Sequence, residues 1–171
     1  MPVWATAAGG GLDLISTTSF SAVSSVSVSS CFSATYDNYL IKLNSTIISS
    51  SNGNVDLRLR VGGSDTTTNY RRQYIAANGA TLSSGREVSN TSFNGIGYLQ
   101  TAFSNEFTIN IANPYNTVVT TAFSNIVQVG GGNIESQISA YGLNDTTSYT
   151  GFTIICPNTM TGSVSVYGYK K

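Results

Sequence analysis

Histidine is absent from this sequence of 171 residues. Without an imidazole, the chain lacks the side chain that titrates near neutral pH, the commonest general base and the commonest metal ligand. Ser-His-Asp, Cys-His and histidine-ligated zinc sites are therefore excluded. The carboxylates mostly stand alone in or beside expected turns. We therefore expect no enzyme, no catalytic residue, no cofactor and no metal site.

Charge is also scarce. Only 9% of the residues are charged, against a usual share of about 25%, and eight basic residues balance eight acidic ones. A neutral chain lacks the electrostatic attraction that holds nucleic acid or an acidic membrane. No apolar run approaches the ~18 residues of a membrane span, and no secretory signal opens the chain. We expect a protein made in a cytoplasm, with no nucleic-acid or membrane partner.

Cysteine occurs only twice, at Cys31 and Cys156, which are far apart in the sequence and form no metal-ligand spacing. Two interpretations are open. The residues are reduced thiols that pack as small hydrophobic side chains, or they form a cross-sheet disulfide, which requires Cα atoms closer than ~7 Å.

The missing charge is replaced by 25 Ser, 21 Thr and 16 Asn, together with 10 Tyr and 7 Phe. No long window carries the apolar stripe of a helix, whereas apolar and polar residues alternate with period two in many short segments, as half-buried strands require. The predicted strands are 26–28, 39–48, 55–61, 107–111, 122–129, 134–141, 151–155 and 163–169, with less regular candidates at 70–77 and 93–99.

Turn signals separate these segments at intervals of about ten residues. Ser51-Asn52-Gly53-Asn54 predicts a tight hairpin between 39–48 and 55–61. Ser83-Ser84-Gly85 and Pro157-Asn158 predict turns as well. This spacing indicates an all-β protein, an antiparallel β-sandwich of the jelly-roll type with two four-stranded sheets. We expect one such domain over 16–171 and an extended N-terminal arm over 1–15.

The predicted strand over 55–61 carries an unusual share of the charge. Its apolar residues fall on one face and Asp56, Arg58 and Arg60 on the other, because side chains alternate across a pleat. Arg71 and Arg72 follow nearby. Either these five residues form a subunit interface, or the arginines pair locally with acidic residues and contribute little.

The N-terminal arm contains Pro2, Val3 and Trp4 before the glycines at 9–11. Trp is a favoured anchor at interfaces, so these residues are candidates for a contact with a partner. The alternative is that Trp4 folds back onto its own sheet.

Tyrosine is frequent toward the C-terminus. Aromatic rings stack on sugar faces, so Tyr141, Tyr149, Tyr167 and Tyr169 are candidate glycan contacts. The alternative interpretation places these tyrosines on strands of the sandwich and between subunits.

Several segments together show a family resemblance. They are 32–39 (FSATYDNY), 57–60 (LRLR), 69–73 (NYRRQ), 107–111 (FTINI) with Asn113-Pro114, 147–155 (TSYTGFTII) and 162–169 (GSVSVYGY). Over about residues 16–169 the chain resembles jelly-roll structural proteins of tailed bacteriophages, particularly those that infect cyanobacteria. The resemblance implies a virion component, made in the bacterial host and commonly a homotrimer.

Two placements on the particle follow from this resemblance. A capsid decoration, or cement, protein would bridge subunits of the major capsid protein of the same phage, with Pro2, Val3 and Trp4 as the contact arm. A tail-fibre or tail-tip domain would instead present tyrosines to a host-surface glycan. The short chain and the absence of a fibrous shaft favour decoration.

Overall fold

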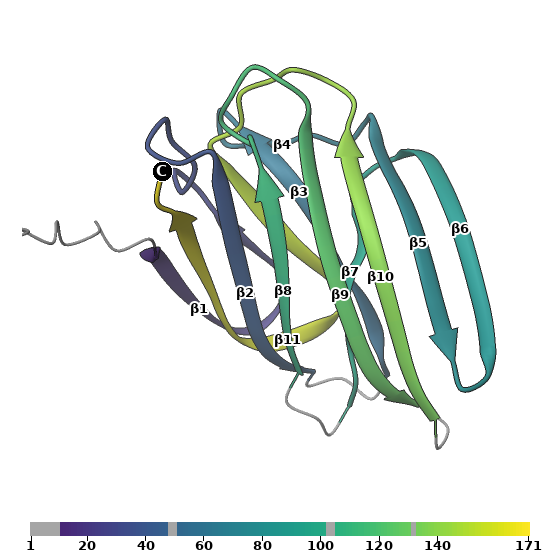
Figure 1. Ribbon diagram of the computed structural model, residues 1–171. Helices are drawn as coiled ribbons and strands as arrows, with labels where there is room; N and C mark the ends of the chain where they lie inside the picture. The colour runs from purple at the N-terminus through teal and green to yellow at the C-terminus, as the bar shows by residue number, and fades with distance from the viewer. Residues whose placement is uncertain (1–10, 48–50, 102–104, 131–132) are drawn as a thin grey trace, which may run out of the picture.

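The chain folds into a single antiparallel sheet that curls into a half-barrel (Figure 1). The computed structural model describes residues 11–47, 51–101, 105–130 and 133–171, and these residues form strands, turns and loops but no helix. Within these ranges no helix is present that could cross a membrane. The all-β antiparallel class predicted from the alternation is confirmed.

Within the described residues, eleven strands make up the sheet. They are β1 (Leu12–Val28), β2 (Asn38–Ile47), β3 (Gly53–Val61), β4 (Ser64–Asp65), β5 (Tyr70–Asn78), β6 (Thr81–Asn90), β7 (Phe93–Leu99), β8 (Asn105–Ala112), β9 (Thr120–Gly130), β10 (Asn133–Leu143) and β11 (Gly151–Tyr169). The order is β4-β3-β11-β2-β8-β9-β10-β5-β6, with β1 paired to β11 and β7 to β3.

The long strand β11 joins two layers. Its first part, 151–155, pairs with β3, and its second part, 160–168, pairs with β2. β1 follows β11 along its other edge through three register shifts. Because bulges bend and twist a strand pair, β3 and β7 are carried behind β2, β8 and β9 (Figure 1). The result is a small layer packed on the concave side of a large one.

Glycine permits the close approach of strands near this bend. A Cβ at Gly162 would lie 2.0 Å from the backbone oxygen of Asn44, and one at Gly151 would lie 2.2 Å from that of Val28. No side chain fits at these distances. The two glycines therefore let β11 lie tightly against its neighbours on both sides of the bend.

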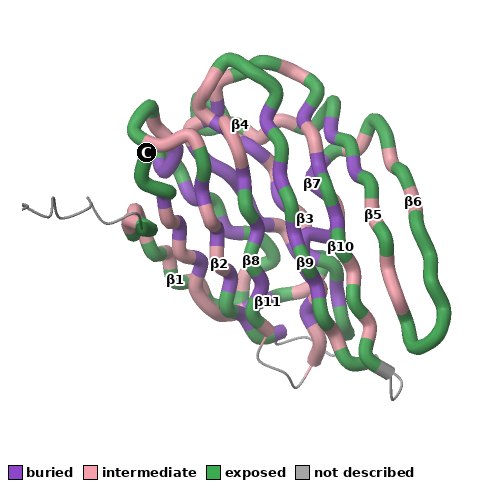
Figure 2. Tube along the Cα trace, viewed as in Figure 1, coloured by how far each residue is buried: buried purple, intermediate pink, exposed green. Residues whose placement is uncertain are grey.

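The core fills the space between the layers, where purple buried segments alternate with less buried ones along the central strands, such as β2, β3 and β8 (Figure 2). Leu57 and Leu59 of β3 and Ile41 of β2 are fully buried. The Phe93 ring of β7 meets Tyr70 edge-on, with 5.0 Å between ring centroids, and lies 5.3 Å from Tyr141. These ring contacts bring β7 against β5 and β10 across the concave side.

Several sequence-based expectations need correction. The hairpin predicted at 51–54 is wrong, since β2 and β3 do not pair with each other but both pair with β11. The turn predicted at 83–85 lies inside β6, and Pro157-Asn158 lies inside β11. Both segments are poor in apolar residues, and their pairing partners lie far away in the sequence.

The jelly-roll sandwich is not confirmed, because the described strands form one continuous sheet instead of two separate four-stranded ones. Residues 12–15, assigned to the arm, lie in β1 and pair with β11. Residues 1–10, with Pro2, Val3 and Trp4, lie outside the described part of the chain.

Both cysteines are free thiols buried in the core. Cys31 donates a weak hydrogen bond to the carbonyl oxygen of Val28. Burial disfavours the thiolate, and it raises the pKa of Cys31 to about 12 and the pKa of Cys156 above its ordinary value. The interpretation as reduced core thiols fits this structure, and the disulfide does not.

We therefore expect the native protein to resist alkylation. A pKa of about 12 in place of 9.0 lowers the thiolate fraction of Cys31 at pH 8 by about a thousandfold. Iodoacetamide at pH 8, followed by intact mass spectrometry, should give no adduct on the folded chain and two adducts in guanidinium. Rapid labelling of the folded chain would contradict the buried placement.

Candidate functional site

The far half of the large layer, β9-β10-β5-β6, places several large apolar side chains on the convex side. In β9, Phe123, Val127 and Val129 point outward, whereas Ser124 and Gln128 point toward the concave side. A half-buried strand normally turns its apolar face to the core. Here large apolar side chains also meet solvent on the opposite face.

We define the convex patch as seven of the outward apolar side chains of these four strands: Ile75, Leu82, Phe123, Val127, Val129, Ile134 and Ile138. Val129 pairs directly with Ile134, and Ile138 pairs directly with Ile75. Directly opposite residues on one face touch each other, so the patch is continuous across the strands.

The convex patch is large for a monomer. Its members are 45–77% exposed, which at roughly 150–250 Å² per large apolar side chain leaves on the order of 800 Å² of accessible surface. Isolated soluble proteins rarely expose more than about 300–600 Å² in one apolar patch. A standard protein interface buries about 800 Å² on each partner. The patch thus has the size of one interface.

The rest of the convex side differs. On β2 and β8 the outward residues other than Leu40 and Ala112 are polar, and Lys42 pairs with Glu106 at 3.1 Å. The convex patch begins at β9, where Phe123 lies directly opposite the polar Asn110 of β8. Beyond the patch, Arg71 and Arg86 lie on the outward face of β5 and β6, with no ion-pair partner among the described residues. The seven side chains of the convex patch thus lie on one half of the sheet, whereas Leu12 and Leu14 of β1 are exposed at the far edge of the other half.

The five residues predicted as a charged subunit interface are not brought together. Arg58 and Arg60 lie on the outer side of β3, Arg71 on the convex side of β5, and Arg72 on its concave side. Asp56 accepts hydrogen bonds from Ser92 Oγ and from the backbone N–H of Gly95.

The arginines of β3 are satisfied within the chain. Arg60 Nη1 lies 2.6 Å from Asp65 Oδ1 and donates to Thr153 Oγ1 at 2.7 Å. Arg58 Nε donates to the carbonyl oxygen of Thr91 at 3.0 Å. These contacts correspond to the alternative of local pairing.

Arg72 is the most buried of the five, at 9% exposure. Its Nη1 lies 3.1 Å from Glu87 Oε1, and its guanidinium lies 4.3 Å from the centroid of the Tyr74 ring. Gly85, opposite Tyr74, leaves room for that ring, since a Cβ there would lie 2.5 Å from it. The charge is thereby held between a carboxylate and an aromatic face.

The tyrosines predicted to contact a glycan are also separated. Tyr141 and Tyr149 are only 4% and 1% exposed, so neither ring can stack on a sugar. Burial raises the pKa of both phenols. Tyr167 is half-buried, and Tyr169 donates a hydrogen bond to Asn110 Oδ1 at 2.7 Å.

Sequence reasoning did not identify the convex patch, because alternation alone does not say which face of a strand is buried. A signal was nevertheless present in β9 and β10. Their inward set includes Ser124, Gln128, Glu135 and Gln137, which is too polar for an ordinary core face.

Comparisons with known proteins do not assign this chain to a family. No protein-family model and no curated protein matches the chain. Among solved structures, the chain is similar to the CBM2 module of the evolved Dit of Lactobacillus casei BL23 phage J-1. The identity is 10%, the alignment covers 86% of this chain and 69% of that one, and the TM-score is 0.28. A similarity at this level assigns neither topology nor function.

The buried ion pair yields a stability prediction. Glu87→Gln should destabilise the fold by about 2 kcal/mol, because it leaves the Arg72 charge buried without its carboxylate. Glu106→Gln is the matched control, since the Lys42–Glu106 pair is 41% and 53% exposed and should contribute less than about 0.5 kcal/mol. Urea unfolding of both variants measures the difference, and equal losses would contradict the burial argument.

Proposed function

We propose that the protein is a structural, non-enzymatic component of a bacteriophage virion. In the more specific form of the proposal, it is a homotrimeric capsid decoration (cement) protein, made in the cytoplasm of the bacterial host, that bridges subunits of the major capsid protein. The observation that carries the proposal is the convex patch. The sequence resemblance to phage structural proteins supports the virion setting.

A second copy of this chain is the proposed occupant of the convex patch. The patch has the area of one standard interface side, and the chain's net charge of zero adds no repulsion between copies. Burial of apolar area contributes roughly 25 cal/mol per Å², before the costs of association are deducted. Of the charged residues predicted at the interface, Arg71 is the one beside this surface.

The capsid contact is assigned to a different part of the chain. Pro2, Val3 and Trp4 precede β1, whose edge away from β11 has no partner strand among the described residues. A segment that enters the sheet through an edge strand can reach a neighbouring molecule without crossing its own core. Contacts between copies and contacts with the shell thus use separate surfaces.

Purified phage particles test where the protein lies in the virion. Phage produced by cells that carry the gene are purified on a density gradient and analysed by mass spectrometry and cryo-electron microscopy. The chain should be present on the shell, in multiples of three. Its absence from particles would overturn the proposal, and a position at the tail tip would favour the second candidate, a tail-fibre or tail-tip domain that binds host-surface glycan.

The subunit contact is tested in solution. Ile138→Asp places a charge in the centre of the convex patch and should convert the oligomer to monomer, because a carboxylate cannot be desolvated there without a partner. Thr108→Asp, on the polar half of the same side, is the control and should remain oligomeric. Sedimentation velocity measures both, and a monomeric wild-type protein would contradict the assignment.

Deletion of residues 1–10 tests the arm. The deleted chain retains all of β1 and should keep its fold and oligomeric state while losing binding to shells that lack the protein. Co-sedimentation with such shells is the measurement. Undiminished binding would exclude Pro2, Val3 and Trp4 as the capsid contact.

A further inference from the structure

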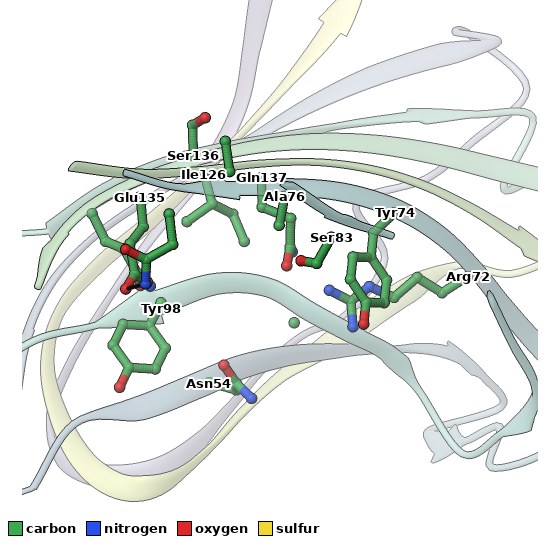
Figure 3. A pocket seen from close by; sticks show the side chains of 14 residues that line it. Asn54, Arg72, Tyr74, Ala76, Ser83, Tyr98, Ile126, Glu135, Ser136 and Gln137 are labelled. Atoms are coloured by element: carbon green, nitrogen blue, oxygen red, sulfur yellow. Dashed lines mark hydrogen bonds between the residues drawn. The ribbon is translucent and has the colours of Figure 1, made fainter. Parts of the chain in front are cut away.

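A polar cleft opens on the concave side, opposite the convex patch (Figure 3). It lies between β7 and β3 on one wall and the large layer on the other, and its volume is about 360 Å³. Its lining residues include Asn54, Arg72, Tyr74, Ala76, Tyr98 and Glu135. Known small-molecule sites are clefts of about 300–1,000 Å³ with a few convergent polar groups.

One end of the cleft holds a carboxylate between two amides. Asn78 Nδ2 donates to one oxygen of Glu135, and Gln128 Nε2 donates to the other. These bonds fix the orientation of both amides. They also leave Gln128 Oε1 buried and without a hydrogen-bond partner in the described part of the chain. A buried acceptor without a partner is costly, so this end is suited to a ligand that donates a hydrogen bond.

The other end holds Arg72 and Tyr74. Glu87 neutralises the guanidinium through Nη1, whereas Nε is buried and has no partner among the described residues. Gly95, with a φ of +63°, faces this group, and a Cβ there would lie 3.3 Å from Nη2. The glycine leaves one side of the guanidinium uncovered. This end therefore has a free hydrogen-bond donor without a free positive charge.

Between the two ends the large layer presents small and apolar side chains. Ala76 and Ile126 point into the cleft, with Gln137 beside them, and the half-buried Tyr98 ring projects from β7 at the rim (Figure 3). Apolar surface and an aromatic ring accept the C–H faces of a sugar, while amides and carboxylates bond its hydroxyl groups. Hydroxyl groups both donate and accept, as the two ends of the cleft require.

Other ligand classes fit less well. Glu135 repels an anion, and the two amide N–H groups that point at its oxygens oppose a cation. No cluster of three metal-ligating side chains occurs within the described ranges. On the large-layer wall, β9, β10 and β5 are each paired on both edges, so their backbone groups cannot bind an extended peptide strand.

We propose that this cleft is a binding site for a neutral saccharide. Glu135 and Gln128 bind hydroxyl groups at one end, Arg72 Nε donates at the other, and Tyr98 stacks on a sugar face. The proposed sugar site does not depend on whether the protein lies on the capsid shell or on the tail. Because the convex patch lies on the opposite side of the sheet, association of copies through it leaves the cleft open.

The test uses the full-length chain on a printed array of neutral oligosaccharides of glucose, galactose, mannose, rhamnose and N-acetylhexosamines. The sugar that gives the strongest signal is then titrated calorimetrically. We expect saturable binding of at least one of these sugars. No saturable binding to any of them would overturn the proposal, whatever the oligomeric state proves to be.

Variants locate the site. Glu135→Gln and Tyr98→Ala should each weaken binding at least tenfold, and Ser83→Tyr should abolish it because the new ring fills the cleft from β6. Ser84→Tyr is the matched control, since its side chain lies on the opposite face of the same strand and should leave binding unchanged.

Circular dichroism and thermal unfolding establish that each variant is folded, and sedimentation establishes its oligomeric state. Undiminished binding by folded Glu135→Gln and Ser83→Tyr would show that the sugar binds elsewhere, and it would refute the cleft as the binding site. Loss of oligomers with sugar binding retained would instead count only against the proposed subunit contact.

Discussion

The shared strand β11 is the constraint on which the rest of the structure depends. Because its two parts pair with β3 and β2 on the same edge, and β1 follows it on the other, the sheet has to bend where the pairing changes. The bend carries β3 and β7 over the concave side and creates the core. It also gives the sheet two unlike sides, and both proposed surfaces follow from that difference.

The small layer does not cover the whole of the large one. β7 contacts β9 and, less extensively, β5 and β10, and it meets β6, at the edge of the sheet, where Asn94 donates a hydrogen bond to Glu87. Near β7, the rings of Phe93, Tyr70 and Tyr141 fill the space between the layers. Farther along the same strands, Gln128, Glu135 and Gln137 point inward without a packed layer opposite them, so a solvated cleft replaces the core.

The replacement of the packed core by a cleft explains why the far half of the sheet carries apolar side chains on its convex side. Where no core faces the concave side, most inward positions are polar, and most large apolar residues of the same strands point outward because side chains alternate. The convex patch then gathers half of the large hydrophobic side chains that the described residues expose. The proposed burial of the patch against other copies and an open cleft are compatible, since they use opposite faces of the same four strands.

Part of the fold could be predicted from the sequence. The strands at 39–48, 107–111 and 122–129 are recognisable because an apolar residue recurs at every second position, and this period suits no helix. The Ser- and Thr-rich part of β1 and all of β6 escaped prediction, since neither contains a regular apolar face and both are held by distant partners. The hairpin predicted between β2 and β3 was wrong for a related reason. A turn signal is a local feature, and it does not reveal that a strand pairs with a distant part of the chain.

By itself, the sequence determined a histidine-free, nearly uncharged, all-β chain, because composition and period-two alternation are local properties. Only the tertiary structure decided which face of β9 and β10 meets solvent, and that Arg72, Tyr98 and Glu135 line one cleft while Arg58 and Arg60 are satisfied elsewhere. Those outcomes depend on how β11 pairs across more than a hundred residues, and alternation within a strand is identical whichever side the rest of the chain covers.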